Sequence, residues 1–271
     1  DEGAASLPTV AVRMPSHPVA AALLRACKLP IAAPSANRSG KPSPTRAWHV
    51  AEDLAGVIPF IIDGGACEYG LESTVLDLTG PAPVILRPGA VSAEAITAAV
   101  AAATATATGT GAPAQAELLA QPTATSSSAP KSPGMKYRHY APAAELLICD
   151  QPTPAERAAA IATLLATRLG QADRETWPKV GLYLSAETYA LLRNHPELSL
   201  PVPTESSWLE LHVYAERAEP AAASHHLFDA LRTLDQKAVV TIIAEGLPTG
   251  GTGTAYINRL RKAAGGGEVP R

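Results

Sequence analysis

Apolar positions along the first hundred residues follow two patterns, short uninterrupted runs and stretches with helical spacing. The runs have the length of β-strands and are bounded by Pro, Gly or Ser; they lie at 9–13, 29–34, 57–63, 73–79 and 83–89. Helical spacing is present from about Ser16, where Pro18 suits a first turn, again up to about Leu54, and from Ser92. This alternation predicts an α/β domain.

A second alternation begins after Ala141, with a different order of runs and helices. Its predicted strands are at 144–150, 179–184 and 238–244, and its predicted helices are at 154–169, 187–193, around 227–234 and after 254. Strands separated by helices predict a small parallel sheet with helices on its faces. We find no repeat between the two parts of the chain.

The segment between the two alternations, 101–130, consists mainly of Ala, Thr, Ser, Gly and Pro, which is the composition of a flexible connector. Extension of the preceding helix through its alanines is the alternative interpretation. The chain is therefore predicted to divide into a first domain at 1–103, a linker and lid at 104–143, and a second domain at 144–271.

Composition excludes several classes of protein. Hydrophobic residues make up 46% of the chain, enough for each domain to bury a core, so a fully disordered chain is excluded. The net charge of -3 gives no overall attraction to nucleic acid or an anionic membrane. Cys27, Cys67 and Cys149 lack the spacing of zinc or disulfide sites, and no apolar run reaches the length of a membrane helix. We therefore expect a cytoplasmic protein.

The polar loop 35–45 has the richest chemistry in the first domain. It places serines, an amide and two cationic side chains between a predicted strand and a helix, where α/β proteins bind anions. It is not a Walker A loop, because Ser35 and Pro42 stand where that motif needs Gly and Ser or Thr. A plain connection is the alternative. Arg13 and Arg87 each end a predicted strand, and two such guanidinium groups suit a phosphate or carboxylate ligand.

Other motifs are less specific. A glycine pair at 64–65 predicts a tight turn ahead of the polar residues 72–74. The glycines of 246–254 precede a helix and suit a phosphate, but the G-x-G-x-x-G pattern is absent. His225 and His226 adjoin a helix stripe and are expected on the surface. The sequence has no nucleophile elbow and no metal-ligand spacing, so we expect no resident metal site.

A series of motifs in a fixed order gives the chain a family resemblance. Within 9–142 they are TVAVRMP, PIAAPSAN, PSPT, DGG, ESTV, LRPG and PGMKYRHYAP. In sequence and spacing they resemble the two-domain threonylcarbamoyl-AMP synthases, whose first domain is YrdC-like. LFDALRTLD and GTAYINRLRKA, at 227–235 and 253–263, are similar to that family's smaller second domain. The resemblance implies a YrdC-like α/β domain joined by a long linker to a Rossmann-like α/β domain.

The resemblance also implies a reaction and its partners. Such enzymes join L-threonine, bicarbonate and ATP into threonylcarbamoyl-AMP with release of pyrophosphate, and supply the tRNA-modifying transferase machinery. ATP is then a substrate, and we expect Mg2+ to accompany it. The residues implied for threonine are Arg13, Ala33 and Ser73. The residues implied for ATP are Thr9, Ser35, Asn37, Ser43, Arg87 and Tyr140.

The first domain departs from the family pattern before Arg13. The family's P-T-E-T-V-Y-G-like and K-x-R motifs are not found there, so we expect the catalytic Lys and Arg to lie upstream of Asp1. The N-terminal half of a YrdC-like domain would then be missing. Because those cations are expected to neutralise the triphosphate, we expect the 271-residue chain alone to be inactive or nearly so.

The motif SPGMKYRHYAP at 132–142 ends the linker. In the family that the chain resembles, the linker closes over the substrate cleft, which would bring Tyr140 to the nucleotide. The alternative is that Tyr137 and Tyr140 pack at the domain interface.

Two other functions agree less well with the sequence. An RNA-binding or interaction module would use Lys136, Arg138 and the interleaved tyrosines, but the rest of the chain is not basic. Carbamoyl transfer in hydrogenase maturation also involves a YrdC-like domain, but no C-x-x-C of that kind is present.

Overall fold

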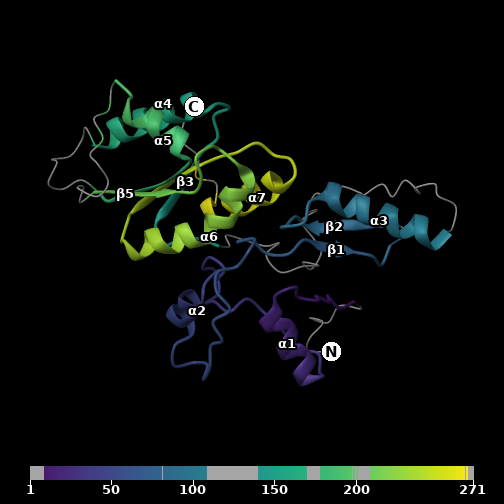
Figure 1. Cartoon of the computed structure of the whole chain (residues 1–271). Coiled ribbons are helices and arrows are strands. Elements are labelled where there is room, and N and C mark those ends of the chain that lie inside the picture. The colour runs from purple at the N-terminus through teal and green to yellow at the C-terminus, as the bar shows by residue number, and fades with distance from the viewer. Residues whose placement is uncertain are drawn as a thin grey trace.

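The computed structural model describes residues 9–80, 82–108, 140–169, 178–196, 198, 200, 208–265 and 267 (Figure 1). We refer to residues 9–108 as the N-terminal part and to residues 140–267 as the C-terminal domain. The N-terminal part contains α1 (Pro18–Cys27), α2 (Ala47–Leu54), β1 (Val75–Asp77), β2 (Val84–Arg87) and α3 (Ala93–Thr108). The C-terminal domain contains β3 (Glu145–Cys149), α4 (Pro154–Leu169), β4 (Val180–Leu184), α5 (Ala186–Arg193), β5 (Leu209–Val213), α6 (Pro220–Gln236), β6 (Thr241–Glu245) and α7 (Thr252–Ala264).

The C-terminal domain is a parallel sheet between two pairs of helices. The strand order is β3-β6-β4-β5, and the three pairings are all parallel. Successive side chains of a strand point to opposite faces, so Leu146 and Ile148 pack in one hydrophobic cluster with α6 and α7. Leu147 and Cys149 pack in the other, with α4 and α5. The predicted α/β architecture with a parallel sheet is confirmed.

Local sequence explains where several helices begin and end. Pro18 and Pro220 occupy the first turn of α1 and α6, where the missing N–H of proline costs no helical hydrogen bond. Ser185 caps α5 by accepting a hydrogen bond from the backbone N–H of Thr188 at 3.3 Å. Gly265 ends α7 with φ 61, in the left-handed region that glycine enters without strain.

The N-terminal part forms fewer strands than its apolar runs predict. The runs at 73–79 and 83–89 are confirmed as an antiparallel pair, β1 and β2. The predictions of strands at 9–13, 29–34 and 57–63 are wrong, since these segments have no regular strand structure. A strand needs a neighbour for its backbone groups and a layer over its apolar face. Among the described residues, the pairing of these segments is limited to an isolated bridge between Ala55 and Ile58, and side chains such as Phe60 are exposed, at 84%.

The structure also differs from the sequence predictions at β5 and in the segment after position 100. β5 was missed, because its sequence LELHV carries a Glu and a His and becomes a strand by pairing with β4. The alternative of a helix continuing through the alanines after position 100 is confirmed as far as Thr108. The rest of the predicted linker, 109–139, lies outside the described residues.

In the part of the chain that is described, no helix has the length and apolar character needed to cross a membrane.

The helices α6 and α7 face the N-terminal part (Figure 1). Arg232 of α6 reaches Asp53 of α2, and Arg259 of α7 reaches Glu72 just before β1. Gly70 packs so closely on α6 that a Cβ there would lie 2.0 Å from the carbonyl oxygen of His225. The C-terminal domain is therefore docked on the segment that carries the ESTV motif.

Candidate functional site at the domain junction

A partly buried carboxylate, Glu72, connects the two parts of the molecule. Its Oε1 accepts a hydrogen bond from Ser43 Oγ at 2.8 Å, and its Oε2 accepts one from Arg259 Nε at 2.8 Å. Burial raises the pKa of Glu72, but the charge of Arg259 and the two hydrogen bonds outweigh burial and hold that pKa below its ordinary value. The ionised carboxylate thus ties the polar loop to α7.

Arg87 ends β2 next to this carboxylate. Its Nη2 donates to the carbonyl oxygen of Ser73 at 2.9 Å. Burial lowers the pKa of Arg87, while the charge of Glu72 opposes that shift. The antiparallel register pairs Val75 with Arg87, which explains why Ser73 and Arg87 meet at one end of the hairpin. The register therefore brings together two residues that the sequence implied for different substrates.

Gly89 allows this approach of the two strands. A Cβ at Gly89 would lie 2.3 Å from the backbone nitrogen of Thr74 and 2.4 Å from the carbonyl oxygen of Glu72. No side chain fits between these backbone segments. The glycine of LRPG is thus required to hold the chain after Arg87 against the ESTV segment.

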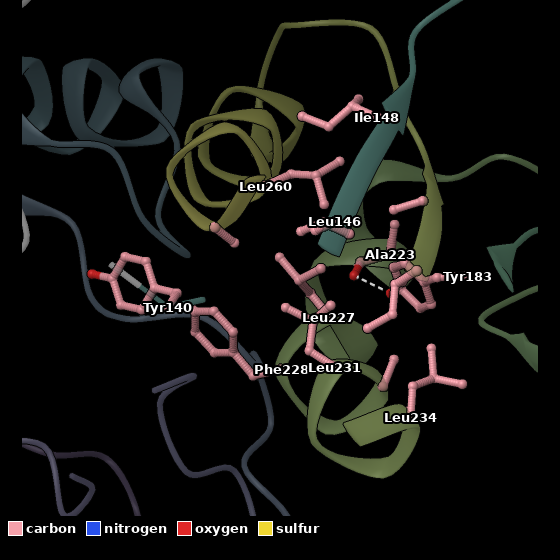
Figure 2. Packing of buried hydrophobic residues seen from close by; sticks show 14 of the residues in the cluster. Tyr140, Leu146, Ile148, Tyr183, Ala223, Leu227, Phe228, Leu231, Leu234 and Leu260 are labelled. Carbon is pink, nitrogen blue, oxygen red and sulfur yellow. Dashed lines mark hydrogen bonds between the residues drawn. The ribbon is translucent and has the colours of Figure 1, made fainter. Parts of the chain in front are cut away.

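Tyr140 lies where the chain enters the C-terminal domain. Its ring stacks on Phe228 with 5.2 Å between centroids, and Arg259 Cζ lies 5.7 Å from the ring centroid. Burial, followed by the charge of Glu72, raises the pKa of Tyr140 to about 12. Figure 2 shows Tyr140 at the edge of the hydrophobic cluster, with its hydroxyl directed away from Phe228. The interface packing foreseen as one alternative is thus present for Tyr140, while a contact with nucleotide stays a prediction.

The neighbour of Tyr140 fixes the polar loop to this entry point. The backbone N–H of Ala141 donates to the carbonyl oxygen of Gly40 at 2.9 Å. Tyr140 itself has φ 68, in the left-handed region that residues other than glycine seldom adopt. The bend turns the chain between the loop and α6. Residues 109–139 of the predicted linker and lid, which include Tyr137, Lys136 and Arg138, lie outside the described residues.

The remaining predicted site residues are not part of this group. Asn37 folds its own loop, with Nδ2 donating to the carbonyl oxygens of Arg38 at 2.9 Å and Lys41 at 3.3 Å. Four others are exposed on segments without regular structure: Thr9, Arg13, Ala33 and Ser35. Within the described ranges, no hydrogen bond or ion pair joins these four to Ser43, Ser73, Arg87 or Tyr140. Arg13 and Arg87 therefore do not meet as ends of one sheet.

Arg259 was missed as a site residue. It lies on the buried stripe of α7 with Ala255, Tyr256 and Ala263, at spacings of three and four residues. The signal was present in the sequence, because an arginine on an apolar helix stripe is rarely buried without an acidic partner. Its partner lies 187 residues earlier in the chain, so the pattern alone does not reveal it.

A second group of charged residues joins the domains beyond this site. Arg232 donates to Asp53 Oδ2 at 2.6 Å and to the Pro42 carbonyl oxygen at 2.7 Å. Asp229 accepts from Arg46 Nε at 3.0 Å. The prediction that His225 and His226 are surface residues is wrong, since both are partly buried at the interface.

His225 shows why the surface assignment failed. Its Nδ1 lies 2.6 Å from the carbonyl oxygen of Glu68, in the N-terminal part. A stripe of polar residues beside an apolar helix face is typical of solvent exposure, but this stripe is covered by docking of the other part of the molecule.

The described residues do not include a ready metal site. No group of three or more His, Cys, Asp or Glu side chains among them is arranged to hold a metal ion. Glu72 is the carboxylate nearest Arg87 in the site, and both of its oxygens are already engaged by Ser43 and Arg259.

Comparison with known proteins places the chain in a family of enzymes with this arrangement of two α/β domains. Residues 91–265 match the family described as "Threonylcarbamoyl-AMP synthase, C-terminal domain", and residues 1–89 match the family described as "Telomere recombination". The first match alone covers more than half of the chain. The chain belongs to the threonylcarbamoyl-AMP synthase family.

Individual relatives agree with this assignment. The threonylcarbamoyl-AMP synthase of Bacillus subtilis (strain 168) is 40% identical over 97% of this chain and 65% of the relative. That of Pyrococcus abyssi is 41% identical over 96% of this chain and 65% of the relative. The crystal structure of P. abyssi Sua5 complexed with L-threonine is similar with a TM-score of 0.77 and 38% identity, over 98% of this chain and 67% of that one. The chain spans just under two thirds of these two curated relatives.

Proposed function

We propose that the protein is an L-threonylcarbamoyladenylate synthase, which converts L-threonine, bicarbonate and ATP into threonylcarbamoyl-AMP and pyrophosphate. The observation that carries the proposal is 40% identity to a named synthase over 97% of the chain. The similarity to a structure of a relative complexed with L-threonine supports threonine as the amino-acid substrate. The product would pass to the tRNA-modifying transferase machinery, in the cytoplasm.

The proposed substrate residues are those implied by the family resemblance. Ser73, with Arg13 and Ala33, would hold threonine, and Arg87, with Ser43 and Tyr140, would hold ATP. Contact between Arg87 and Ser73 supports adjacent threonine and nucleotide sites. Thr9, Ser35 and Asn37 complete the proposed ATP set.

Charge at the junction supports an anionic substrate. Burial lowers the pKa of Lys262, the charges of Arg259 and Arg87 lower it further, and the charge of Glu72 opposes the shift, so three cationic groups and one carboxylate act on one another here. A half-buried site with more positive than negative charge attracts an anion, and a guanidinium group suits a phosphate through paired donors. A triphosphate fits this balance.

In the proposed reaction, the threonine amine and bicarbonate form a carbamate and water. A carbamate oxygen then attacks the α-phosphorus of ATP, the bond to the bridging oxygen of the β-phosphate breaks, and pyrophosphate leaves. The protein need form no covalent bond, so orientation of the two substrates and neutralisation of phosphate charge provide the rate enhancement. Arg87 would supply part of that charge.

Mg2+ belongs to this proposal only as a companion of ATP. Mg2+ is held in many ATP sites by one or two carboxylates together with the substrate's phosphates. Glu72 does not fit as a ligand, since both of its oxygens accept hydrogen bonds from the protein. The proposed steps therefore rest on the protein's own residues and its substrates.

The structure of a relative in which an adjacent His and Tyr are substituted supports a role for Tyr140. P. abyssi Sua5 with an adjacent His and Tyr both replaced by Ala is similar to this chain, with a TM-score of 0.75. This chain contains a single His-Tyr dipeptide, His139–Tyr140. The coincidence supports a functional role for Tyr140 in the proposed reaction.

The proposal is tested by pyrophosphate release in a chimera, in which this chain replaces the matching region of the Bacillus subtilis synthase. We expect release that requires both L-threonine and bicarbonate. Arg87→Met should lower kcat/KM by roughly tenfold to a hundredfold, since a charged hydrogen bond contributes about 1.5–3 kcal/mol. Arg193→Met, an exposed change on α5, is the matched control. A chimera that folds cooperatively but releases no pyrophosphate would contradict the proposal.

A further inference from the structure

Arg259 is a fully buried arginine of the C-terminal domain whose side chain ends in the N-terminal part. Its Nε donates to Glu72 Oε2 and its Nη2 to the carbonyl oxygen of Pro88, both at 2.8 Å. Its Nη1 donates to Asn258 Oδ1 at 2.9 Å, and its Cζ lies 5.7 Å from the Tyr140 ring centroid. Each nitrogen of the guanidinium group thus has a hydrogen-bond acceptor, and the Tyr140 ring lies beside the group.

The partners of Arg259 are the chain neighbours of the proposed substrate residues. Glu72 directly precedes Ser73, and Pro88 directly follows Arg87. One guanidinium group therefore holds the side chain of the residue before Ser73 and the backbone carbonyl of the residue after Arg87, on either side of the Ser73–Arg87 contact. The same group lies over Tyr140, so three proposed substrate residues depend on one side chain of α7.

Docking of the two domains does not by itself explain this arginine. Removing an arginine from water costs several kcal/mol, and apolar residues of similar volume often give equal or greater stability. Arg232 already links the same two parts through Asp53 and Pro42. Arg259 in addition fixes the relative position of its acceptors. Its planar guanidinium group holds two acceptors at once in set directions, which neither lysine nor an apolar residue can do.

We propose that Arg259 is a positioning residue, through which the C-terminal domain sets the arrangement of Ser73, Arg87 and Tyr140 in the substrate site. This inference rests on the proposed synthase function. It assigns the C-terminal domain a part in the site itself, acting through Glu72, Pro88 and the Tyr140 ring. Loss of Arg259 would leave the domains docked but the threonine subsite disordered.

The first test asks whether Arg259 orders Tyr140, and it needs no enzyme activity. The 271-residue chain is prepared with 3-fluorotyrosine at position 140, and its fluorine resonance is compared in Arg259→Met, Arg259→Lys and Arg232→Met. We expect Arg259→Met to shift and broaden the resonance. Arg232→Met should leave the resonance unchanged, although this substitution also removes a buried cross-domain arginine. Urea unfolding of both variants measures how much stability each substitution costs. An unchanged resonance in Arg259→Met, or equal changes in Arg259→Met and Arg232→Met, overturns the proposal.

The second test uses the active chimera and measures KM for L-threonine at saturating ATP. We expect Arg259→Met to raise it at least tenfold, Arg259→Lys to fall between Met and the parent, and Arg232→Met to stay within threefold of the parent. Equal KM values for Arg259→Met and Arg232→Met overturn the proposal, since both arginines would then only dock the domains. If the parent chimera releases no pyrophosphate, the proposed function fails, and the fluorine comparison still decides whether Arg259 orders Tyr140.

Discussion

The ion pair between Asp53 and Arg232 shows how much one residue at the junction contributes. Burial raises the pKa of Asp53, but hydrogen bonds from Arg232 and Lys41 outweigh it and hold the pKa below its ordinary value. Arg232→Met leaves this carboxylate buried without its main partner, so we expect unfolding in urea to show a loss of about 3–5 kcal/mol. Adding Asp53→Asn should restore part of the loss. A loss below about 1 kcal/mol for Arg232→Met would contradict the importance of this pair.

The Tyr140 ring lies at the junction of the two parts of the molecule, in contact with both α6 and α7. In the chimera, Tyr140→Ala removes a ring stacked on Phe228 beside Arg259. We expect KM for ATP to rise roughly tenfold and free threonylcarbamoyl-AMP to be lost to hydrolysis faster, because the site is less closed to water. Tyr140→Phe keeps the stacking and is the matched control for the hydroxyl. If Tyr140→Ala has the kinetics of the parent, Tyr140 serves interface packing alone.

The segment between α2 and β1 depends at element scale on Gly70, which has φ 70 and lies against the backbone of α6. Gly70→Ala places a methyl group on the His225 carbonyl oxygen in a conformation that L-residues avoid. We expect a loss of about 2–5 kcal/mol in urea unfolding. Gly65→Ala is the control, since Gly65 has φ 87 but no atom near the new Cβ; about 1–2 kcal/mol is expected there. Equal losses would show that contact with α6 is unimportant.

Elements with a clear local pattern were predicted correctly where the fold also gives them a neighbour to pair or pack with. α4 begins at a proline and follows an apolar period, and β4 is a short apolar run, so both were expected where they lie. The runs at 9–13 and 57–63 have the same local signal but no neighbouring strand among the described residues. In the site, Arg87 was found because strand-end arginines are visible in sequence. Arg259 was not, because its role depends on a distant carboxylate.

At the scale of the whole molecule, we expect stability to depend on pH through His212 and His226. Burial lowers the pKa of both histidines below 6.5, and the positive charge of Arg46 lowers both pKa values further. His226 also faces His225, while Asp229 opposes the shift. The unfolded chain therefore binds protons to these two histidines more readily than the folded chain does. The stability that the neutral histidines give the folded chain is complete above pH 6.5, and it is lost as pH falls from there through their lowered pKa values in the folded chain.

We therefore expect the free energy of unfolding in urea to fall between pH 7 and pH 5. His226→Gln should make that fall shallower, because one of the two titrating groups is then absent. The hydrogen bond with His49 is the largest of the effects that set the pKa of Asp229 at about 2, so this carboxylate stays ionised throughout that range. A stability that is constant from pH 7 to pH 5, or a slope unchanged by His226→Gln, would contradict this origin.

The cross-domain pairs also set an order of events during synthesis. Asp53 is 179 residues ahead of Arg232, and Glu72 is 187 residues ahead of Arg259. At a translation rate of about 5–20 residues per second, each carboxylate is synthesised roughly 10–40 seconds before its arginine. During that interval the ESTV segment cannot take its final place. The surface of the N-terminal part that docks on α7 therefore stays uncovered until α7 emerges.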